Sequence, residues 1–180
     1  MNLYLHVRAC LLLLAAFAVS PALAQTHTAP PSAPGSGPCP AKPEYRQFDF
    51  WVGEWEVTDR GRKIADSSIQ RIVGDCIIFE NYTQSDGYTG KSFNFYDAAL
   101  GRWRQTWVDS SGNVSEFVGE FKDNAMRFEG ETHRSAGNKV LRRMTLFNLG
   151  PDRVRQYSER SLDGGKTWGV GYDYVYIRKK

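Results

Sequence analysis

Short stretches in which apolar and polar residues alternate follow one another along the chain, and turn-forming residues separate them. Alternation with a period of two places successive side chains on opposite faces of a β-strand. Gly, Asn, Asp or Pro stands between the stretches, where a tight turn needs a positive or a preset φ. We therefore predict about ten strands. Their ranges are 54–58, 63–73, 76–83, 91–97, 102–109, 114–121, 126–132, 140–147, 153–161 and 167–178.

The connections between the predicted strands are short, so consecutive strands are expected to pair as an antiparallel meander. An open sheet of this size would leave exposed edges, and closing it into a barrel removes them. No long amphipathic helix interrupts the strands, and residues 43–51 predict only a short helical turn that packs Phe48, Phe50 and Trp51 inward. The pattern therefore predicts an all-β, up-and-down barrel as a single domain over residues 43–180.

Aromatic side chains dominate the inward faces that this alternation predicts. One face of the last strand carries Trp168, Val170, Tyr172, Tyr174 and Tyr176. Polar residues fall among apolar ones on other strands, namely Glu80, Asn94, Gln105 and Gln156. These polar residues indicate a cavity in which a few polar groups anchor a ligand. The alternative is that they face outward or pair with one another inside the barrel.

The N-terminal region has a different composition from the rest of the chain. Arg8 precedes an apolar run over residues 11–19, and Ala22-Leu23-Ala24 forms an A-x-A cleavage site. Residues 1–24 are therefore predicted to be a cleavable secretion signal, because the apolar run is too short to span a membrane. Residues 25–42 are rich in Pro, Ser and Gly and predict a disordered leader. We expect the mature protein to be periplasmic or secreted.

The net charge of the chain and the distribution of its basic residues indicate which classes of partner to expect. The chain has 23 Lys and Arg against 20 Asp and Glu, and Arg8 leaves with the predicted signal. The remaining basic residues are scattered, with tight pairs only at Arg142-Arg143 and Lys179-Lys180. This nearly neutral balance predicts neither nucleic acid nor an anionic membrane as a partner.

Two of the 3 cysteines, Cys39 and Cys76, remain after removal of the signal. In an oxidising compartment two cysteines indicate one disulfide, which would tie the N-terminal segment to the third predicted strand. The alternative is a pair of unpaired thiols, one of them buried.

Two motifs carry structural information. The first is Gly53-Glu54-Trp55, which resembles the G-x-W signature of lipocalins and other calycins. In that group the Trp closes one end of the barrel and a basic residue near the end of the last strand packs on it. The resemblance implies this role for Trp55, with Arg178 as the basic partner through a cation–π contact.

The second motif covers residues 161–168 and matches S-x-D-x-G-x-T-W through Ser161, Asp163, Gly165 and Trp168. It resembles the Asp-box of sialidases, where it builds a hairpin and has no catalytic role. Together with residues 48–55, 74–76, 95–97 and 105–109, this segment resembles exported bacterial proteins near the domain-of-unknown-function 1579 family. That resemblance implies a lipocalin-like barrel and an exported setting, and it implies no activity.

Catalytic, metal and cofactor sites are not predicted. No phosphate-binding loop, dinucleotide fingerprint or nucleophile elbow is present in the sequence. The strand pattern places His133 in a loop. It is the only candidate for a haem ligand, but we interpret it as a solvated loop residue. The Glu116–Glu120 and Glu129–Glu131 pairs each fall on one strand face and are expected to be exposed.

The favoured hypothesis is a barrel that binds a small, mainly apolar ligand. The residues expected to line its cavity are Tyr82, Tyr96, Gln105, Trp107, Tyr172 and Tyr174. Two alternatives remain open. One is an envelope interaction module that uses its outer face and has a filled barrel. The other is a cavity-based enzyme, which needs a titratable group inside the barrel with a perturbed pKa, and Glu80 is the candidate for that group.

Overall fold

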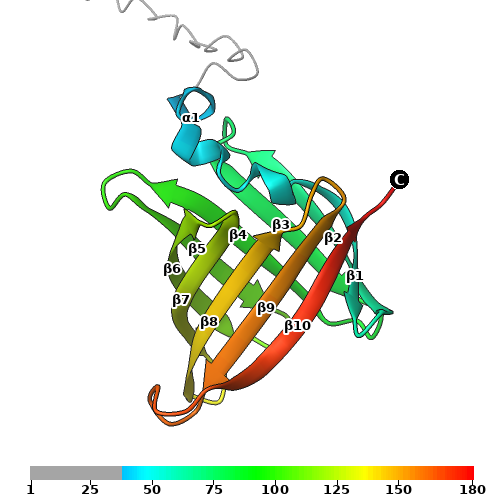
Figure 1. Cartoon of the computed structure of the whole chain (residues 1–180). Helices are drawn as coiled ribbons and strands as arrows, with labels where there is room; N and C mark the ends of the chain where they lie inside the picture. The colour runs from blue at the N-terminus through cyan, green and yellow to red at the C-terminus, as the bar shows by residue number, and fades with distance from the viewer. Residues whose placement is uncertain (1–37) are drawn as a thin grey trace, which may run out of the picture. The chain divides into compact units, whose positions relative to one another are not determined.

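Each predicted strand is present in the computed structural model, which describes residues 38–180 (Figure 1). The strands are β1 (Gly53–Asp59), β2 (Arg62–Ile72), β3 (Ile77–Gln84), β4 (Thr89–Asp97), β5 (Arg102–Asp109), β6 (Val114–Lys122), β7 (Ala125–His133), β8 (Lys139–Asn148), β9 (Arg153–Ser161) and β10 (Gly169–Arg178). A short helix α1 (Pro38–Ala41) and two 3-10 turns, η1 (Pro43–Arg46) and η2 (Asp49–Trp51), precede them. The predicted signal, and the predicted leader up to residue 37, lie outside the described residues.

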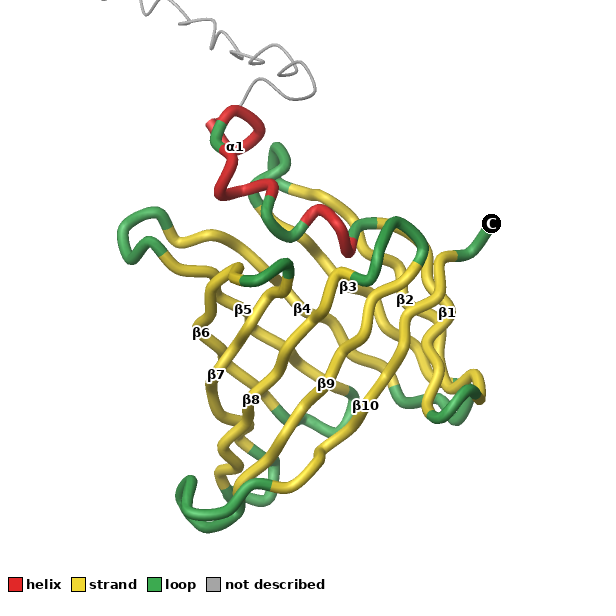
Figure 2. The backbone as a smooth tube through the Cα atoms, in the orientation of Figure 1, coloured by secondary structure: helices red, strands yellow, loops and turns green. Residues whose placement is uncertain are grey.

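The strands form a closed antiparallel barrel in which each strand pairs with its neighbours in sequence (Figure 2). Pairing of β1 with β10 closes the sheet, with Trp55 opposite Arg178 and Asp59 opposite Tyr174. The β6–β7 hairpin shows the turn chemistry behind this meander. Its two turn residues, Asp123 and Asn124, both have positive φ, as a type I′ turn requires. The prediction of an all-β, up-and-down barrel is confirmed.

An aromatic plug, defined here as residues 43–51, fills one end of the barrel. Phe48 and Trp51 are fully buried, their rings lie 5.0 Å apart, and Phe48 also meets Trp103 edge to face. The prediction that this segment packs inward is confirmed for these two residues, whereas Phe50 is only partly buried. The plug closes this end because its buried aromatic rings fill the space inside the barrel there.

Arg178 and Trp55 form the predicted pair beside the plug. The guanidinium carbon lies 4.1 Å from the centre of the Trp55 ring, and Nη1 donates to the carbonyl of Val52 at 3.0 Å. Gly53 makes room for this contact, because a Cβ there would lie 2.0 Å from Arg178 Nη1. Gly53 also has a φ of 139°, which other residues rarely adopt.

We expect Arg178→Met to lower the free energy of unfolding by about 1–2 kcal/mol, because the cation–π contact and the bond to Val52 are lost while the apolar stem remains. Urea unfolding of the two proteins measures this difference. Arg153→Met, which removes an exposed cation from β9, is the control and should unfold like the wild type. Equal losses in both variants would contradict the structural role of Arg178.

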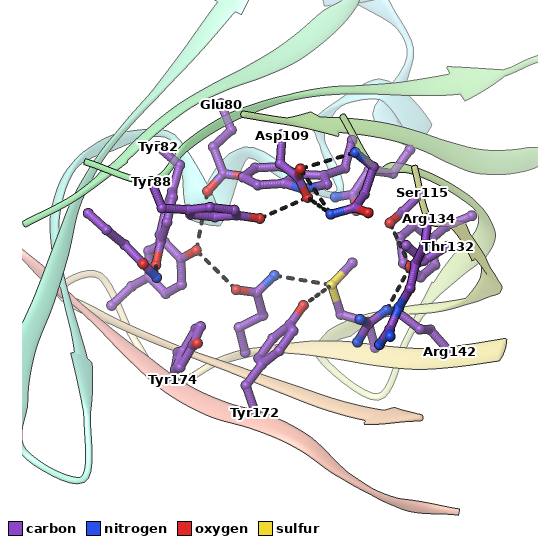
Figure 3. Close-up of a pocket in the computed structure, with 18 of the residues that line it drawn as sticks. Glu80, Tyr82, Tyr88, Asp109, Ser115, Thr132, Arg134, Arg142, Tyr172 and Tyr174 are labelled. Atoms are coloured by element: carbon purple, nitrogen blue, oxygen red, sulfur yellow. Dashed lines mark hydrogen bonds between the residues drawn. The ribbon is translucent and has the colours of Figure 1, made fainter. Parts of the chain in front are cut away.

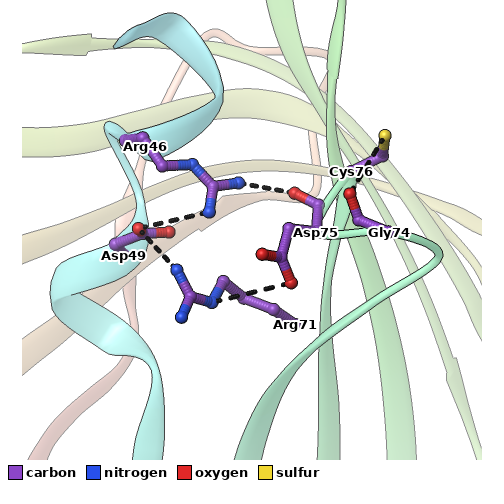
Figure 4. A network of polar contacts seen from close by, with 6 residues as sticks. All are labelled: Arg46, Asp49, Arg71, Gly74, Asp75 and Cys76. Carbon is purple, nitrogen blue, oxygen red and sulfur yellow. Dashed lines mark hydrogen bonds and ion pairs between the residues drawn. The ribbon is translucent and has the colours of Figure 1, made fainter. Parts of the chain in front are cut away.

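The N-terminal segment is held to the β2–β3 turn by a disulfide and by charged groups. Cys39 and Cys76 are bonded, with their Cα atoms 5.1 Å apart, as the cysteine count predicted. Next to this bond, Asp49 lies 3.5 Å from Arg46 and 3.3 Å from Arg71 (Figure 4). Cys39 is 4% exposed and belongs to α1, so packed structure begins before the predicted boundary at residue 43.

The inward face of β10 differs from the one that strict alternation predicts. The register with β9 shifts between Val170 and Tyr172, so Gly171 forms a bulge. A bulge inserts one residue and turns the preceding side chains to the other face. Tyr172, Tyr174 and Tyr176 therefore face inward as predicted, whereas Val170 is 58% exposed. Trp168 precedes the strand and packs against Arg143, whose guanidinium carbon lies 4.0 Å from the ring centre.

The Asp-box forms the β9–β10 turn, as predicted. Asp163 accepts hydrogen bonds from the amide of Thr167 at 2.9 Å and from Ser161 Oγ at 2.7 Å. Trp168 Nε1 donates to the carbonyl of Gly165 at 3.1 Å. Hydrogen bonds from Thr167 and Ser161 lower the pKa of Asp163 to about 2. The carboxylate of Asp163 thus holds the turn together through these hydrogen bonds.

Within residues 38–180, no helix has the length and apolar character needed to cross a membrane.

Candidate functional site: the open half of the barrel

A cavity of about 560 Å³ occupies the half of the barrel away from the aromatic plug (Figure 3). It lies among the β3–β4, β5–β6 and β7–β8 connections, which contribute Asp86, Asn113 and Arg134 to its rim. Its volume is in the range of small-molecule sites in proteins. The barrel therefore consists of a filled half and a hollow half.

Aromatic rings from two sides of the barrel line this cavity. Tyr172 and Tyr174 on β10 stack with their ring centres 4.6 Å apart. Tyr82 on β3 lies 5.9 Å from Trp107 on β5, with the two rings edge to face. Gly90 on β4 permits this arrangement, because a Cβ there would lie 2.1 Å from the Trp107 ring. These surfaces suit a flat apolar group.

A chain of buried polar groups crosses the floor of the cavity and links strands on opposite sides of the barrel. The contacts are Gln105 Nε2 to Asn94 Oδ1 (2.6 Å), Asn94 Nδ2 to Ser92 Oγ (2.9 Å), Ser92 Oγ to Glu80 Oε2 (3.0 Å), Ser67 Oγ to Glu80 Oε1 (2.9 Å), Tyr176 Oη to Glu80 Oε1 (3.2 Å) and Tyr176 Oη to Gln156 Oε1 (3.0 Å). The predicted polar residues thus pair with one another, and Glu80, Gln105 and Gln156 also line the cavity. The internal pairing that the alternative predicted is present, and the anchoring of a ligand by these groups stays a prediction.

Glu80 is the centre of this chain and is only 3% exposed. Burial raises its pKa to about 7, and the hydrogen bonds from Ser67, Ser92 and Tyr176 lower the pKa only in part. Glu80 is therefore largely protonated in mildly acidic solution. When it is ionised, its two oxygens accept from hydroxyl groups of the barrel.

Acidic and basic groups occupy different walls at the mouth. Asp109 accepts from Tyr88 Oη at 2.9 Å and from Asn113 Nδ2 at 3.0 Å. Burial acts to raise the pKa of Asp109, but these hydrogen bonds outweigh it and the pKa is lowered. On the facing wall, Arg142 Nε donates to Thr132 Oγ1 at 2.7 Å. Asp109 is therefore well supplied with donors inside the protein.

Five of the six residues predicted to line a cavity do so: Tyr82, Gln105, Trp107, Tyr172 and Tyr174. The prediction is wrong for Tyr96. Its side chain lies at the plugged end, 5.4 Å from the Tyr45 ring and 6.1 Å from the Trp103 ring. The prediction failed because alternation assigns only a face of the strand. Tyr96 shares an inward face with Asn94, but that face does not specify which end of the barrel a residue occupies.

Sequence reasoning missed Tyr88, Asp109 and Arg142. Tyr88 precedes the first residue of β4, where alternation assigns no face. Asp109 ends β5 and continues the inward face of Gln105 and Trp107, which is the signal that could have identified it. Arg142 belongs to the adjacent pair Arg142-Arg143 on β8, and adjacent strand residues face opposite sides. One arginine of that pair had to point inward, which is the signal that could have identified it.

Other candidate chemistry lies outside the cavity. His133 is the last residue of β7 rather than a loop residue, and its Nε2 lies 2.7 Å from Glu131 Oε1. It does not line the cavity, so it offers no ligand there to a haem. Among residues 38–180, no group of three or more His, Cys, Asp or Glu is arranged to hold a metal ion. Glu116, Glu120 and Glu129 are exposed, as expected, whereas Glu131 is only partly exposed and pairs with His133 and Lys139.

No family model matches the chain, and no curated protein matches it. The geometry of the cavity is therefore the basis for inferring its function.

Proposed function

We propose that this protein is an exported, lipocalin-like barrel that binds a small ligand with a mainly apolar body in the open half of the barrel. The hollow half, with its stacked Tyr172 and Tyr174 facing the Tyr82–Trp107 pair, carries this proposal. Aromatic walls with a few polar groups are typical of small-molecule sites. The polar groups on the floor of the cavity orient the ligand, and the aromatic rings provide the apolar surface that it contacts.

Export is part of the same proposal. The Cys39–Cys76 bond supports it, because disulfides persist in oxidising compartments outside the cytosol. The secretion signal over residues 1–24 remains a prediction from the sequence. The Arg178–Trp55 contact supports the lipocalin-like part of the proposal, whereas kinship with the domain-of-unknown-function 1579 family rests on the sequence motifs alone.

A neutral fluorescent probe, N-phenyl-1-naphthylamine, tests the binding proposal directly. We expect its fluorescence to rise on addition of the folded protein, because an apolar ring leaves water for the aromatic walls. Tyr174→Ala should weaken binding about three- to tenfold, since one ring of the stacked pair is lost. A fluorescence titration gives the dissociation constant.

Tyr157→Ala is the matched control, because Tyr157 lies on β9 with its ring against Arg155 and does not line the cavity. Its affinity for the probe should equal that of the wild type. If the folded wild-type protein bound neither this probe nor either of the naphthalene compounds introduced below, the binding proposal would be refuted and the outer-face interaction module preferred. Native mass spectrometry of protein purified from a bacterial periplasm then identifies any mass that is retained until denaturation.

Glu80 is the residue on which a cavity-based enzyme would depend. Its buried position and raised pKa are properties of catalytic carboxyls. However, Ser67 and Ser92 each donate to one of its oxygens, so the group is engaged on both sides. We assign Glu80 to the polar floor of a binding site.

A further inference from the structure

The charge at the cavity mouth is asymmetric once internal partners are considered. Asp109 accepts from Tyr88 and Asn113, as described above, and Asp86 accepts from the amide of Tyr88 at 3.0 Å. Among the described residues, neither Arg134 nor Arg142 forms an ion pair with a carboxylate. The acidic groups thus have donors, whereas the two arginines that line the cavity have no carboxylate partner within residues 38–180.

Arg142 is the best placed of these cations. It projects from β8, is only partly exposed and is held on one side by Thr132, which in turn contacts Ser115 at 2.7 Å. On the other side its Nη1 reaches the Gly171 bulge of β10, since a Cβ at Gly171 would lie 3.4 Å from that atom. The guanidinium is therefore fixed at its Nε, and among the described residues its terminal nitrogens form no ion pair with a carboxylate.

A second cation lies at the same cavity. Arg134 lines the rim on the β7–β8 connection and, like Arg142, forms no ion pair with a carboxylate of the described residues. Arg160 lies opposite Arg142 in the β8–β9 pairing but is exposed and does not line the cavity. An anion in the cavity would therefore meet the charges of Arg134 and Arg142.

Arg142 is also adjacent to the aromatic wall. Burial raises the pKa of Tyr172 to about 12, and the charge of Arg142 acts in the opposite direction, which reflects their proximity. Tyr172 in turn stacks on Tyr174. A flat group resting on these rings would carry a substituent within reach of the guanidinium.

We infer that the ligand is a small planar organic acid whose carboxylate binds Arg142 while its ring packs against Tyr172 and Tyr174. This inference rests on the proposed binding function and specifies its ligand class. A planar guanidinium matches a carboxylate through paired, charge-assisted hydrogen bonds. Thr132 positions Arg142 by accepting from its Nε.

Two probes of nearly equal shape test this inference: 2-naphthoate, which carries a carboxylate, and 2-naphthamide, which is neutral. Isothermal titration calorimetry at neutral pH gives both dissociation constants for the wild-type protein. We expect naphthoate to bind at least about tenfold more tightly than naphthamide. In Arg142→Gln, the ratio of the two constants should fall to near one. Arg153→Gln, which removes an exposed cation from β9, should retain the wild-type ratio.

The outcomes separate this inference from the broader proposal. Equal affinities of the wild type for the two probes would overturn the role of Arg142 and leave apolar binding in place, and this comparison needs no variant to fold. A preference for naphthoate that persists in folded Arg142→Gln would also overturn it. Failure of both probes and of N-phenyl-1-naphthylamine to bind would overturn the binding function itself.

Discussion

Replacing Cys39 and Cys76 together with alanine is expected to lower the free energy of unfolding by about 4 kcal/mol. The bond closes a loop between residues 37 apart in sequence, and opening it releases conformational entropy in the unfolded chain. A small barrel has limited total stability, so this loss is a large share of it. Urea unfolding of the oxidised wild type and the double variant measures the difference.

Reduced wild-type protein is the control for the alanine substitutions themselves. If loop closure is the cause, the reduced protein should lose about as much stability as the double variant. Cys39 is buried, so a larger loss in the variant than in the reduced protein would report lost packing at that site. A loss below about 1 kcal/mol in both would show that the Asp49 ion pairs hold the N-terminal segment without the disulfide.

Raising the pH from about 5 to about 8 is expected to lower the free energy of unfolding through Glu80 by about 2–3 kcal/mol. The pKa of Glu80 is about 7 in the folded protein and near 4.5 when the chain is unfolded. Between these values the folded state holds the proton and the unfolded state does not. Stability due to this group is therefore highest below the unfolded pKa and decreases as the pH rises through the folded pKa.

Glu80→Gln isolates this effect, because a glutamine amide resembles the protonated carboxyl and does not titrate. The free energy of unfolding, measured in urea at each pH, should decrease more steeply with pH for the wild type than for this variant. Glu116→Gln, an exposed substitution on β6, should follow the wild type. Parallel curves for the wild type and Glu80→Gln would show that the buried carboxyl has an ordinary pKa.

Local information accounts for most of the architecture. The turn pair Asp123-Asn124 and the alternation around it specify a hairpin without reference to the rest of the chain, because turn dihedrals and strand faces depend on neighbouring residues. Ten such segments with short connections close into a barrel because an open sheet would expose its edges. The contact between Arg178 and Trp55 was also predictable, since their motif resembles one with a known arrangement.

The position of a residue along the barrel axis required the tertiary structure. Alternation placed both Tyr96 and Tyr174 on inward faces. The position of the aromatic plug then decides that Tyr96 lies in the filled half and Tyr174 in the cavity. The Gly171 bulge likewise shifted the β10 face, since a register depends on the partner strand.

The chemistry of the site combines residues that are distant in the sequence. Glu80 on β3 is engaged by donors on β2, β4 and β10, and its pKa follows from that enclosure rather than from its neighbours in the chain. The sequence by itself determined the strands, the turns and the barrel, because these depend on local pattern, and its cysteine count indicated the disulfide that the structure contains. Tertiary structure alone decided which half is hollow, which polar groups pair and which arginine faces the cavity, because each depends on contacts between strands.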